Sequence, residues 1–112
     1  MLAKKYRLAS SREIKKIFQR GKQVKNPYLA IRYNGSLRPV SRCAVIISNK
    51  ISKKAVVRNT LRRRIKSIFF IFQPRFSGNY DMVIIGRSGI VNVPFQGLKL
   101  GIETLFRKAK LL

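Results

Sequence analysis

The chain has 112 residues, and its 26 Lys and Arg against 3 Asp and Glu give a formal net charge of +23. Because 46% of the residues are hydrophobic, the chain is not a disordered polybasic tail and has enough apolar residues for one modest core. Three carboxylates cannot neutralise 26 cations, so the neutralising charge must come from outside, and the densest common polyanion is a nucleic-acid backbone.

The residue types also exclude several classes of function. The chain has no histidine and a single cysteine, Cys43, which excludes an internal disulfide and the usual zinc ligand sets and favours a cytoplasmic location. The sequence contains neither the apolar run of a signal peptide nor a membrane-spanning segment, so no membrane partner is expected. The carboxylates Glu13, Asp81 and Glu103 are far apart in sequence. We therefore predict no catalytic residue, no metal site and no small-molecule substrate for this chain alone.

Residues 11–20 are predicted to form the first helix. Ser10 and Glu13 fit a capping box, in which the Ser10 hydroxyl accepts from the amide of residue 13 and Glu13 reaches back to the amide of Ser10. Gly21 is placed to end the helix in the left-handed conformation. The helix carries one apolar stripe, which consists of Ile14, Ile17 and Phe18.

Two short runs rich in β-branched and aromatic residues follow, at 28–33 and 42–48. They are separated by Asn34-Gly35 and Pro39, a pattern typical of two strands joined by a loop. Residues 21–25 are a candidate for a third, shorter strand. Cys43 alternates with Ala44 on the second run, and we assign it to the core.

The most informative segment, residues 51–72, is predicted to be one long helix. Ser52 is a candidate cap, with Ile51 and Val56 placed as a hydrophobic staple across it, and Pro74 ends the helix. At about 100° per residue, one narrow face is apolar and is predicted to be buried. This face comprises Val57, Leu61, Ile65, Ile68 and Phe72.

The opposite side of this helix is basic. Eight of the seventeen residues at 50–66 are Lys or Arg, and the helix has no acid to pair with them. Charged helix faces normally mix signs to gain pairs between neighbouring turns, so a face of one sign costs repulsion and suggests a polyanion as partner. The face includes Arg58, Asn59, Arg62, Arg63 and Lys66.

The remaining elements complete the predicted fold. Residues 81–86 form a continuous apolar run that is typical of a central strand. Pro94 suits the first turn of a final helix, whose stripe consists of Phe95, Leu98, Ile102, Leu105, Phe106 and Ala109. The order helix, two or three strands, helix, strand, helix predicts an α+β fold, a two-layer α/β sandwich, and not a doubly wound sheet. Residues 1–112 are expected to form a single RNA-binding domain.

Residues 55–63, with Arg58-Asn59-Thr60 and Arg62-Arg63, resemble the signature of the protein component of bacterial ribonuclease P, an Arg-Asn-Arg motif on a basic helix. Residues 7–21, 47–50, 81–87 and 105–108 resemble other parts of that family in the same order. Two positions differ, because Thr60 stands where the family usually has the second Arg and Asn49 where it usually has the first of two lysines.

The resemblance implies an accessory protein to a catalytic RNA. The ribonucleoprotein removes the 5′ leader from precursor tRNA to give the mature 5′ end, so the implied partners are the catalytic RNA subunit and precursor tRNA. The implied cofactor is Mg²⁺ in the holoenzyme, held mainly by the RNA, with none bound by the protein alone. The implied fold is that of the second domain of ribosomal protein S5, with a left-handed strand–helix–strand crossover, whereas general topology rules favour a right-handed one.

The resemblance also implies two binding surfaces. The RNA-binding residues would be Lys50, Lys54, Arg58, Asn59, Arg62, Arg63 and Lys66. A leader groove between the first helix and the sheet would be lined by Ile14, Phe18, Ala30, Arg32, Ile46, Ser48 and Gly86, with Arg87 at its edge. Helical spacing alone is equally consistent with Phe18 as plain core. Composition leaves open a different class, a ribosomal or histone-like basic protein that coats nucleic acid.

Overall fold

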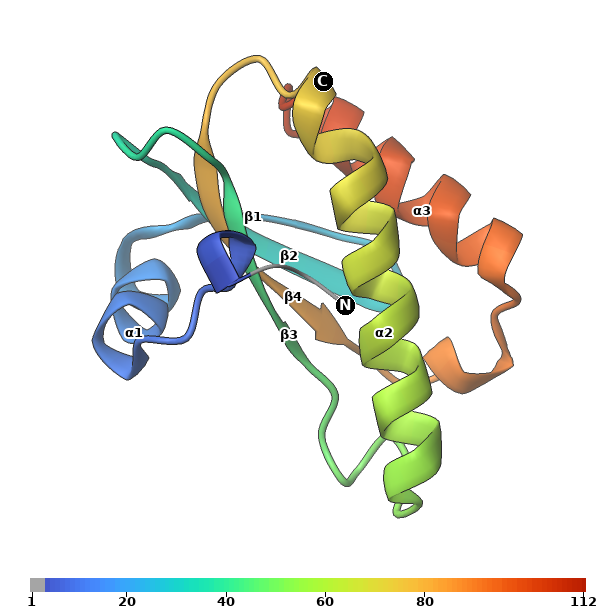
Figure 1. Cartoon of the computed structure of the whole chain (residues 1–112). Coiled ribbons are helices and arrows are strands. Elements are labelled where there is room, and N and C mark those ends of the chain that lie inside the picture. Colours follow the sequence, from blue (N-terminus) through green and yellow to red (C-terminus); the bar gives the residue numbers. More distant parts are fainter. Residues whose placement is uncertain (1–3) are drawn as a thin grey trace.

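A four-stranded sheet with helices on both of its faces makes up the computed structural model, which describes residues 4–112 (Figure 1). The strands are β1 (Lys22–Lys25), β2 (Leu29–Gly35), β3 (Arg42–Ile46) and β4 (Tyr80–Gly86), in the spatial order β1-β2-β4-β3. The helices are α1 (Ser11–Arg20), α2 (Ala55–Phe72) and α3 (Phe95–Lys108), and the 3₁₀ turns are η1 (Lys4–Tyr6), η2 (Gln73–Arg75) and η3 (Ile90–Asn92). The predicted α+β fold is confirmed, with the sheet and the α2–α3 pair as its two main layers.

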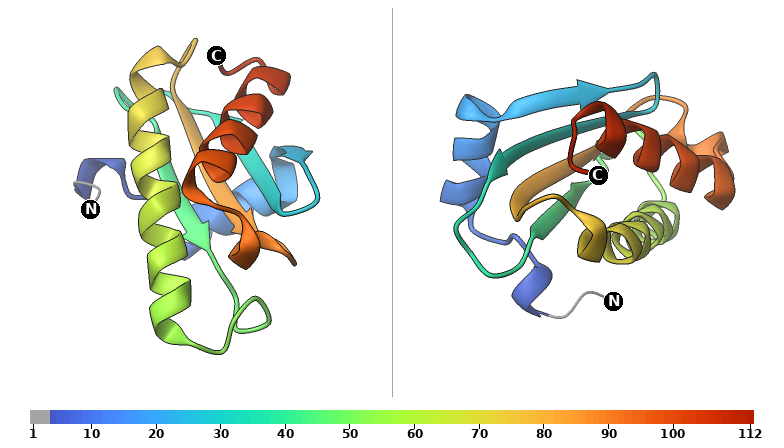
Figure 2. Two further views of the ribbon diagram at one scale, coloured as in Figure 1. Left: turned by 90° about the vertical axis from the view of Figure 1, so that its right-hand side faces the viewer. Right: turned by 90° about the horizontal axis from the view of Figure 1, so that it is seen from above.

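The crossover between β3 and β4 is left-handed. These strands are parallel neighbours, although α2 separates them in the sequence. In the left view of Figure 2, α2 lies in front of the sheet, both strands run downwards, and β4 lies to the right of β3. From the lower end of β3 the chain comes toward the viewer into α2 and then returns to β4, on the right of β3. Because the strands point down in this view, this path turns in the left-handed sense. The general right-handed rule therefore does not hold here.

The main core lies between the sheet and the α2–α3 pair. Alternate residues of β2 and β4, including Ile31 and Ile84, point into it because successive strand residues face opposite sides of a sheet. The predicted stripe of α2 is buried from Leu61 to Phe72, and Phe69 joins it. Cys43 is buried in the same cluster, and burial raises the pKa of its thiol to about 12, so its assignment to the core is confirmed.

The start of α2 differs from the prediction. The helix begins at Ala55, because residues 48–54 first turn from the sheet edge onto its face. Ser52 is not its cap, since the Ser52 hydroxyl accepts from the amide of Lys54 within that loop at 3.2 Å. Val56 is 76% exposed, so the predicted staple with Ile51 is wrong.

The first helix has the predicted bounds, but the interactions that begin and end it differ in part from those predicted. The Ser10 hydroxyl accepts from the amide of Glu13 at 3.3 Å, which confirms one half of the capping box. The Glu13 carboxylate turns instead to Arg42. Gly21 has an ordinary φ of −74°, so the left-handed cap is wrong. Glycine is required there because a Cβ would collide with the carbonyl oxygen of Ile17.

Candidate nucleic-acid interface

The middle of α2 presents a cluster of donors on its solvent side. Asn59, Arg62, Arg63 and Lys66 line one shallow hollow. The Arg62 guanidinium donates to the side-chain oxygen of Asn59 and, at 3.5 Å, to the carbonyl of Ile47 after β3. These contacts hold Arg62 and Asn59 in one arrangement. Arg63 is exposed, and none of the salt bridges among residues 4–112 involves it or Lys66.

A second hollow lies at the start of the same helix. It is lined by Asn49, Lys50, Lys53 and Arg58. Arg58 donates to the carbonyl of Ser52 at 2.8 Å and so holds the loop before α2 against the helix. Lys54 is exposed at the N-cap position, and the first turn has neither an acid nor a side-chain cap. The positive end of the helix dipole therefore adds to the positive charge of the lysines.

The seven RNA-binding residues predicted from the sequence thus lie together on α2 and the loop before it. Together we call them the α2 basic face, which comprises Lys50, Lys54, Arg58, Asn59, Arg62, Arg63 and Lys66. Thr60 lies apart from it: its hydroxyl donates to the carbonyl of Val56 at 2.9 Å, and its side chain shares a hollow with Val91 of η3.

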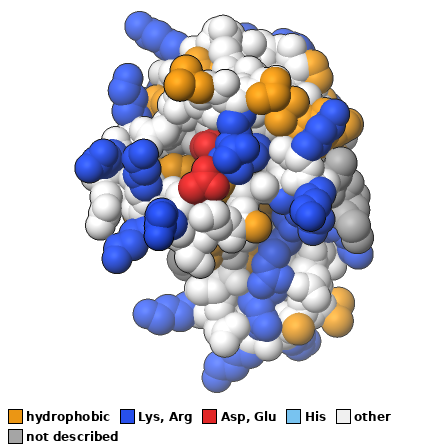
Figure 3. Space-filling model, turned by 60° about the vertical axis from the view of Figure 1, so that its left-hand side comes forward, with side chains coloured by type: hydrophobic (Ala, Val, Ile, Leu, Met, Phe, Trp, Pro, Cys, Tyr) orange, Lys and Arg blue, Asp and Glu red, His pale blue; other side chains and the backbone are white. Residues whose placement is uncertain are grey.

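The carboxylates are all engaged elsewhere. Arg42 is 8% exposed and binds both Asp81, at 2.8 Å, and Glu13, at 2.5 Å, so it joins α1, β3 and β4. The hydrogen bond from Arg42 lowers the pKa of the Glu13 carboxyl below its usual range. Glu103 pairs with Arg107 one turn along α3 at 2.9 Å. On the face that Figure 3 shows, acidic side chains appear at one spot, with Lys and Arg beside them. Within residues 4–112, no side-chain carboxylate is therefore left to neutralise the α2 basic face.

The other face of the sheet is only partly covered, by α1. Ile17 packs on Leu8 and Val83, with Ile14, Ala44 and Ile85 at the edge of this small cluster. Beyond α1 the surface is apolar and open, since Phe18 is 40% exposed and Ile46 is 37% exposed. We call this region the α1-side surface, which comprises Ile14, Phe18, Ala30, Arg32, Ile46 and Ile85, together with Ser48 and Arg87 just past the ends of β3 and β4.

Most of the predicted groove residues lie on the α1-side surface, and Gly86 does not. By strand alternation Gly86 falls on the same side as Met82 and Ile84, and a Cβ there would collide with Ile47 of the main core. The same alternation identifies Ile85, which the sequence-based prediction missed.

Two arginines hold the ends of this surface in place. Arg32 donates to the carbonyl of Phe18 at 2.7 Å and to Gln23 at 2.6 Å, and its guanidinium lies 5.7 Å from the centre of the Phe18 ring. Arg87 donates to the carbonyl of Asn26 at 2.6 Å. Arg32 therefore fixes the Phe18 ring at the end of α1. Gln23, which no sequence pattern indicates as a site residue, helps to orient Arg32.

Two further properties bear on the class of site. No helix within residues 4–112 is long and apolar enough to cross a membrane. The same residues contain no group of three or more His, Cys, Asp or Glu side chains that could hold a metal ion.

Comparison with known proteins gives one consistent family. The sequence model described as ribonuclease P matches residues 2–110. The ribonuclease P protein component of Syntrophomonas wolfei is 32% identical over 111 residues, covering 99% of this chain and 92% of that protein. The RNase P protein of Thermotoga maritima superposes with a TM-score of 0.82 at 25% identity, covering 91% of this chain and 96% of the other. A Staphylococcus aureus RNase P protein mutant superposes with a TM-score of 0.89 at 21% identity, covering 97% of this chain and 92% of the other.

Proposed function

The chain belongs to the ribonuclease P protein family and is a protein component of that endoribonuclease, and from this we propose that its two surfaces serve two RNAs. The α2 basic face binds the catalytic RNA subunit, and the α1-side surface contacts the single-stranded 5′ leader of precursor tRNA. The observation that carries this proposal is the position of α1 and α2 on opposite faces of one sheet (Figure 2). Two RNA segments can therefore bind at the same time.

The chemistry of the α2 basic face suits a folded RNA. A guanidinium presents a planar fork of donors that matches two phosphate oxygens, and Asn59 can both donate and accept toward ribose or backbone. Because Arg62 and Asn59 are already held by their mutual contact, less side-chain entropy is lost when RNA binds.

The α1-side surface suits an unpaired strand. Bases without partners stack on aromatic rings, and the exposed Phe18 ring is fixed by Arg32. The apolar side chains of Ile46 and Ile85 extend this surface, and the charges of Arg32 and Arg87 attract phosphates.

The hydrolytic chemistry belongs to the RNA. Glu13 and Asp81 are both held by Arg42, so these carboxylates do not fit a metal site of the protein. Mg²⁺, held mainly by the RNA, would supply the activated water for hydrolysis when bound. The protein acts in the cytoplasm, where precursor tRNA is made. The ribosomal or histone-like alternative is not favoured, because the family match spans residues 2–110.

Replacement of Phe18 by alanine tests the leader contact. In a holoenzyme reconstituted with the cognate RNA subunit, we expect Phe18→Ala to reduce the preference for precursor over mature tRNA by at least about fivefold, because one stacked base contributes about 1–3 kcal/mol. The measurement is the Kd of each tRNA for the assembled holoenzyme. Ile71→Ala, which removes a similarly exposed side chain from α2, is the control and should leave the ratio unchanged. An unchanged ratio for Phe18→Ala contradicts a leader contact at α1.

A further inference from the structure

Residues 4–10, before α1, lie along the outer edge of the sheet. β3 is an edge strand, and the chain pairs with it through a parallel bridge between Arg7 and Cys43. The amide of Leu8 donates to the carbonyl of Cys43 at 2.9 Å, and the Leu8 side chain is buried. This pairing holds the η1 turn in one place.

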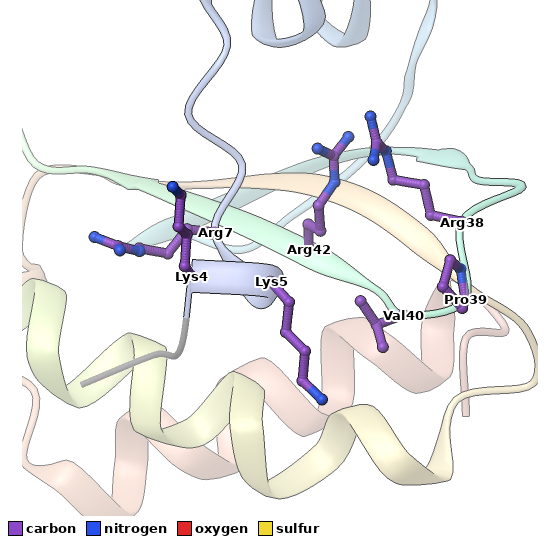
Figure 4. Close-up of a pocket in the computed structure, with 7 residues that line it drawn as sticks. All are labelled: Lys4, Lys5, Arg7, Arg38, Pro39, Val40 and Arg42. Carbon is purple, nitrogen blue, oxygen red and sulfur yellow. The ribbon is translucent and has the colours of Figure 1, made fainter.

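The attachment brings cations from two distant parts of the chain together. Lys4, Lys5 and Arg7 come from the N-terminal segment, and Arg38 comes from the loop between β2 and β3. They line one hollow with Pro39, Val40 and Arg42. Figure 4 shows Lys4 and Arg7 on one side of η1, Arg38 beside Arg42 at the far end, and Lys5 directed toward α2. We call the four exposed cations Lys4, Lys5, Arg7 and Arg38 the edge patch.

The acids near the edge patch do not neutralise it. Glu13 and Asp81 both bind Arg42 directly. Arg38 is 3.8 Å from the Glu13 carboxylate, but more than half of its side chain is exposed. The edge patch carries four positive charges and Arg42 carries a fifth, whereas Glu13 and Asp81 carry two negative charges. The edge patch and its neighbours therefore keep a net charge of +3. Such a surface attracts phosphate, as the α2 basic face does.

The edge patch adjoins the α2 basic face. The ring of Tyr6, within η1, packs edge-to-face on Phe70 of α2 with 5.4 Å between ring centres. Lys66 of the α2 basic face lies four residues before Phe70, so the two side chains are neighbours one turn apart on the same side of the helix. Figure 1 shows η1 in front of β3, between α1 and α2. The edge patch therefore continues the α2 basic face across the sheet edge.

We propose that the edge patch is a second phosphate-contacting surface for the catalytic RNA subunit, an inference that rests on the function proposed above. Its position favours this RNA over the leader. The edge patch lies beside Arg42 and Cys43 at the start of β3, whereas Ile46 and Ser48 of the α1-side surface lie at the other end of this strand. Contacts from lysines and arginines to phosphate position a nucleic acid but carry no sequence information. The edge patch therefore adds affinity and fixes orientation without reading sequence.

A charge-matched pair of triple variants tests the inference. The edge variant carries Lys4→Gln, Lys5→Gln and Arg7→Gln, and the control carries Lys99→Gln, Lys108→Gln and Lys110→Gln on and after α3, so both lower the net charge by three. The Kd for in vitro transcribed cognate ribonuclease P RNA is measured as a function of salt. We expect the edge variant to bind at least about tenfold more weakly, with a salt dependence reduced by roughly one ion per lost contact. The control should change the Kd by less than about twofold.

The outcomes separate the inference from the function on which it rests. If the unmodified protein does not bind this RNA, the proposed function fails. If the unmodified protein binds this RNA and the edge variant has the same Kd as the control, only the role of the edge patch is refuted. If the edge variant binds the RNA subunit normally but weakens precursor tRNA binding to the saturated holoenzyme, the edge patch contacts substrate and the inference is wrong.

A second variant guards against a folding artefact. Arg38→Gln lies in a different loop and should weaken RNA binding by about threefold. Thermal unfolding of each variant shows whether it retains the native fold. If folded Arg38→Gln binds with unchanged affinity and salt dependence, the proposed extent of the edge patch is wrong.

Discussion

Replacement of Arg63 and Lys66 by alanine is expected to weaken binding of the ribonuclease P RNA by about 30-fold, or roughly 2 kcal/mol, because each charge-assisted phosphate contact contributes about 1 kcal/mol or more. These two residues lie in the central hollow of the α2 basic face and make none of the salt bridges found within residues 4–112. Arg62 is a poorer choice, since its guanidinium also bonds Asn59 and the carbonyl of Ile47.

The salt dependence of the Kd distinguishes direct contacts from a general loss of charge. The slope of log Kd against log salt concentration reports the number of counterions released on binding. For the double variant this number should fall by roughly two, because two phosphate contacts are lost. The matched control is Arg64→Ala with Lys108→Ala, which removes the same charge from the η3 side of α2 and from α3. An equal loss of affinity in both variants contradicts a specific RNA contact at the α2 basic face.

Replacement of Arg42 by alanine is expected to lower the free energy of unfolding by about 3 kcal/mol, a large part of the 5–15 kcal/mol typical of a small domain. The side chain of Arg42 is 10% exposed, and its removal leaves Glu13 and Asp81 near each other without a cation between them. This expected loss of stability is at the low end of the range for breaking a buried ion pair, because the Glu13 side chain is 35% exposed and partly hydrated. Urea unfolding measures the change, and Arg107→Ala, which breaks an exposed pair with Glu103, should cost only a few tenths of a kcal/mol.

The pH dependence of this effect has a definite sign. Because Arg42 lowers the pKa of Glu13 in the folded protein, the pair stabilises the fold above the ordinary value of 4.5, and this contribution is lost as the pH falls through the lowered pKa. Protonation also removes the repulsion between the carboxyl groups in Arg42→Ala. The difference in stability between the two proteins should therefore shrink below about pH 4.5. A constant difference from pH 7 to pH 3 contradicts a role for the ion pairs.

Local sequence patterns predicted the helices well. The apolar spacing of Ile65 and Ile68 on α2, and of Leu98 and Ile102 on α3, identified their buried faces because helical periodicity is a property of neighbouring residues. The single-sign face of α2 could be found in the same way. The predicted position of Gly86 in the groove differs from the structure because alternation through Met82 and Ile84 directs this position toward the main core.

Features that depend on distant residues could not be read from the sequence. The position of β4 between β2 and β3 is set by long-range pairing, and the left-handed crossover was implied only by the family resemblance and by no pattern of neighbouring residues. Arg42 joins acids that lie 29 and 39 residues away from it. The edge patch requires the N-terminal segment to pair with β3, which no local pattern indicates.

Cleavage of precursor tRNA shows whether the RNA subunit carries out the hydrolysis and the protein assists it. The cognate RNA subunit, the RNA-free protein and their complex are compared at a low Mg²⁺ concentration, and the 5′ end of the product is mapped. The account predicts no cleavage by the protein alone and a higher kcat/KM for the complex than for the RNA alone, with cleavage at the mature 5′ end. Cleavage at that position by RNA-free protein, or a complex no more active than the RNA alone, would contradict it.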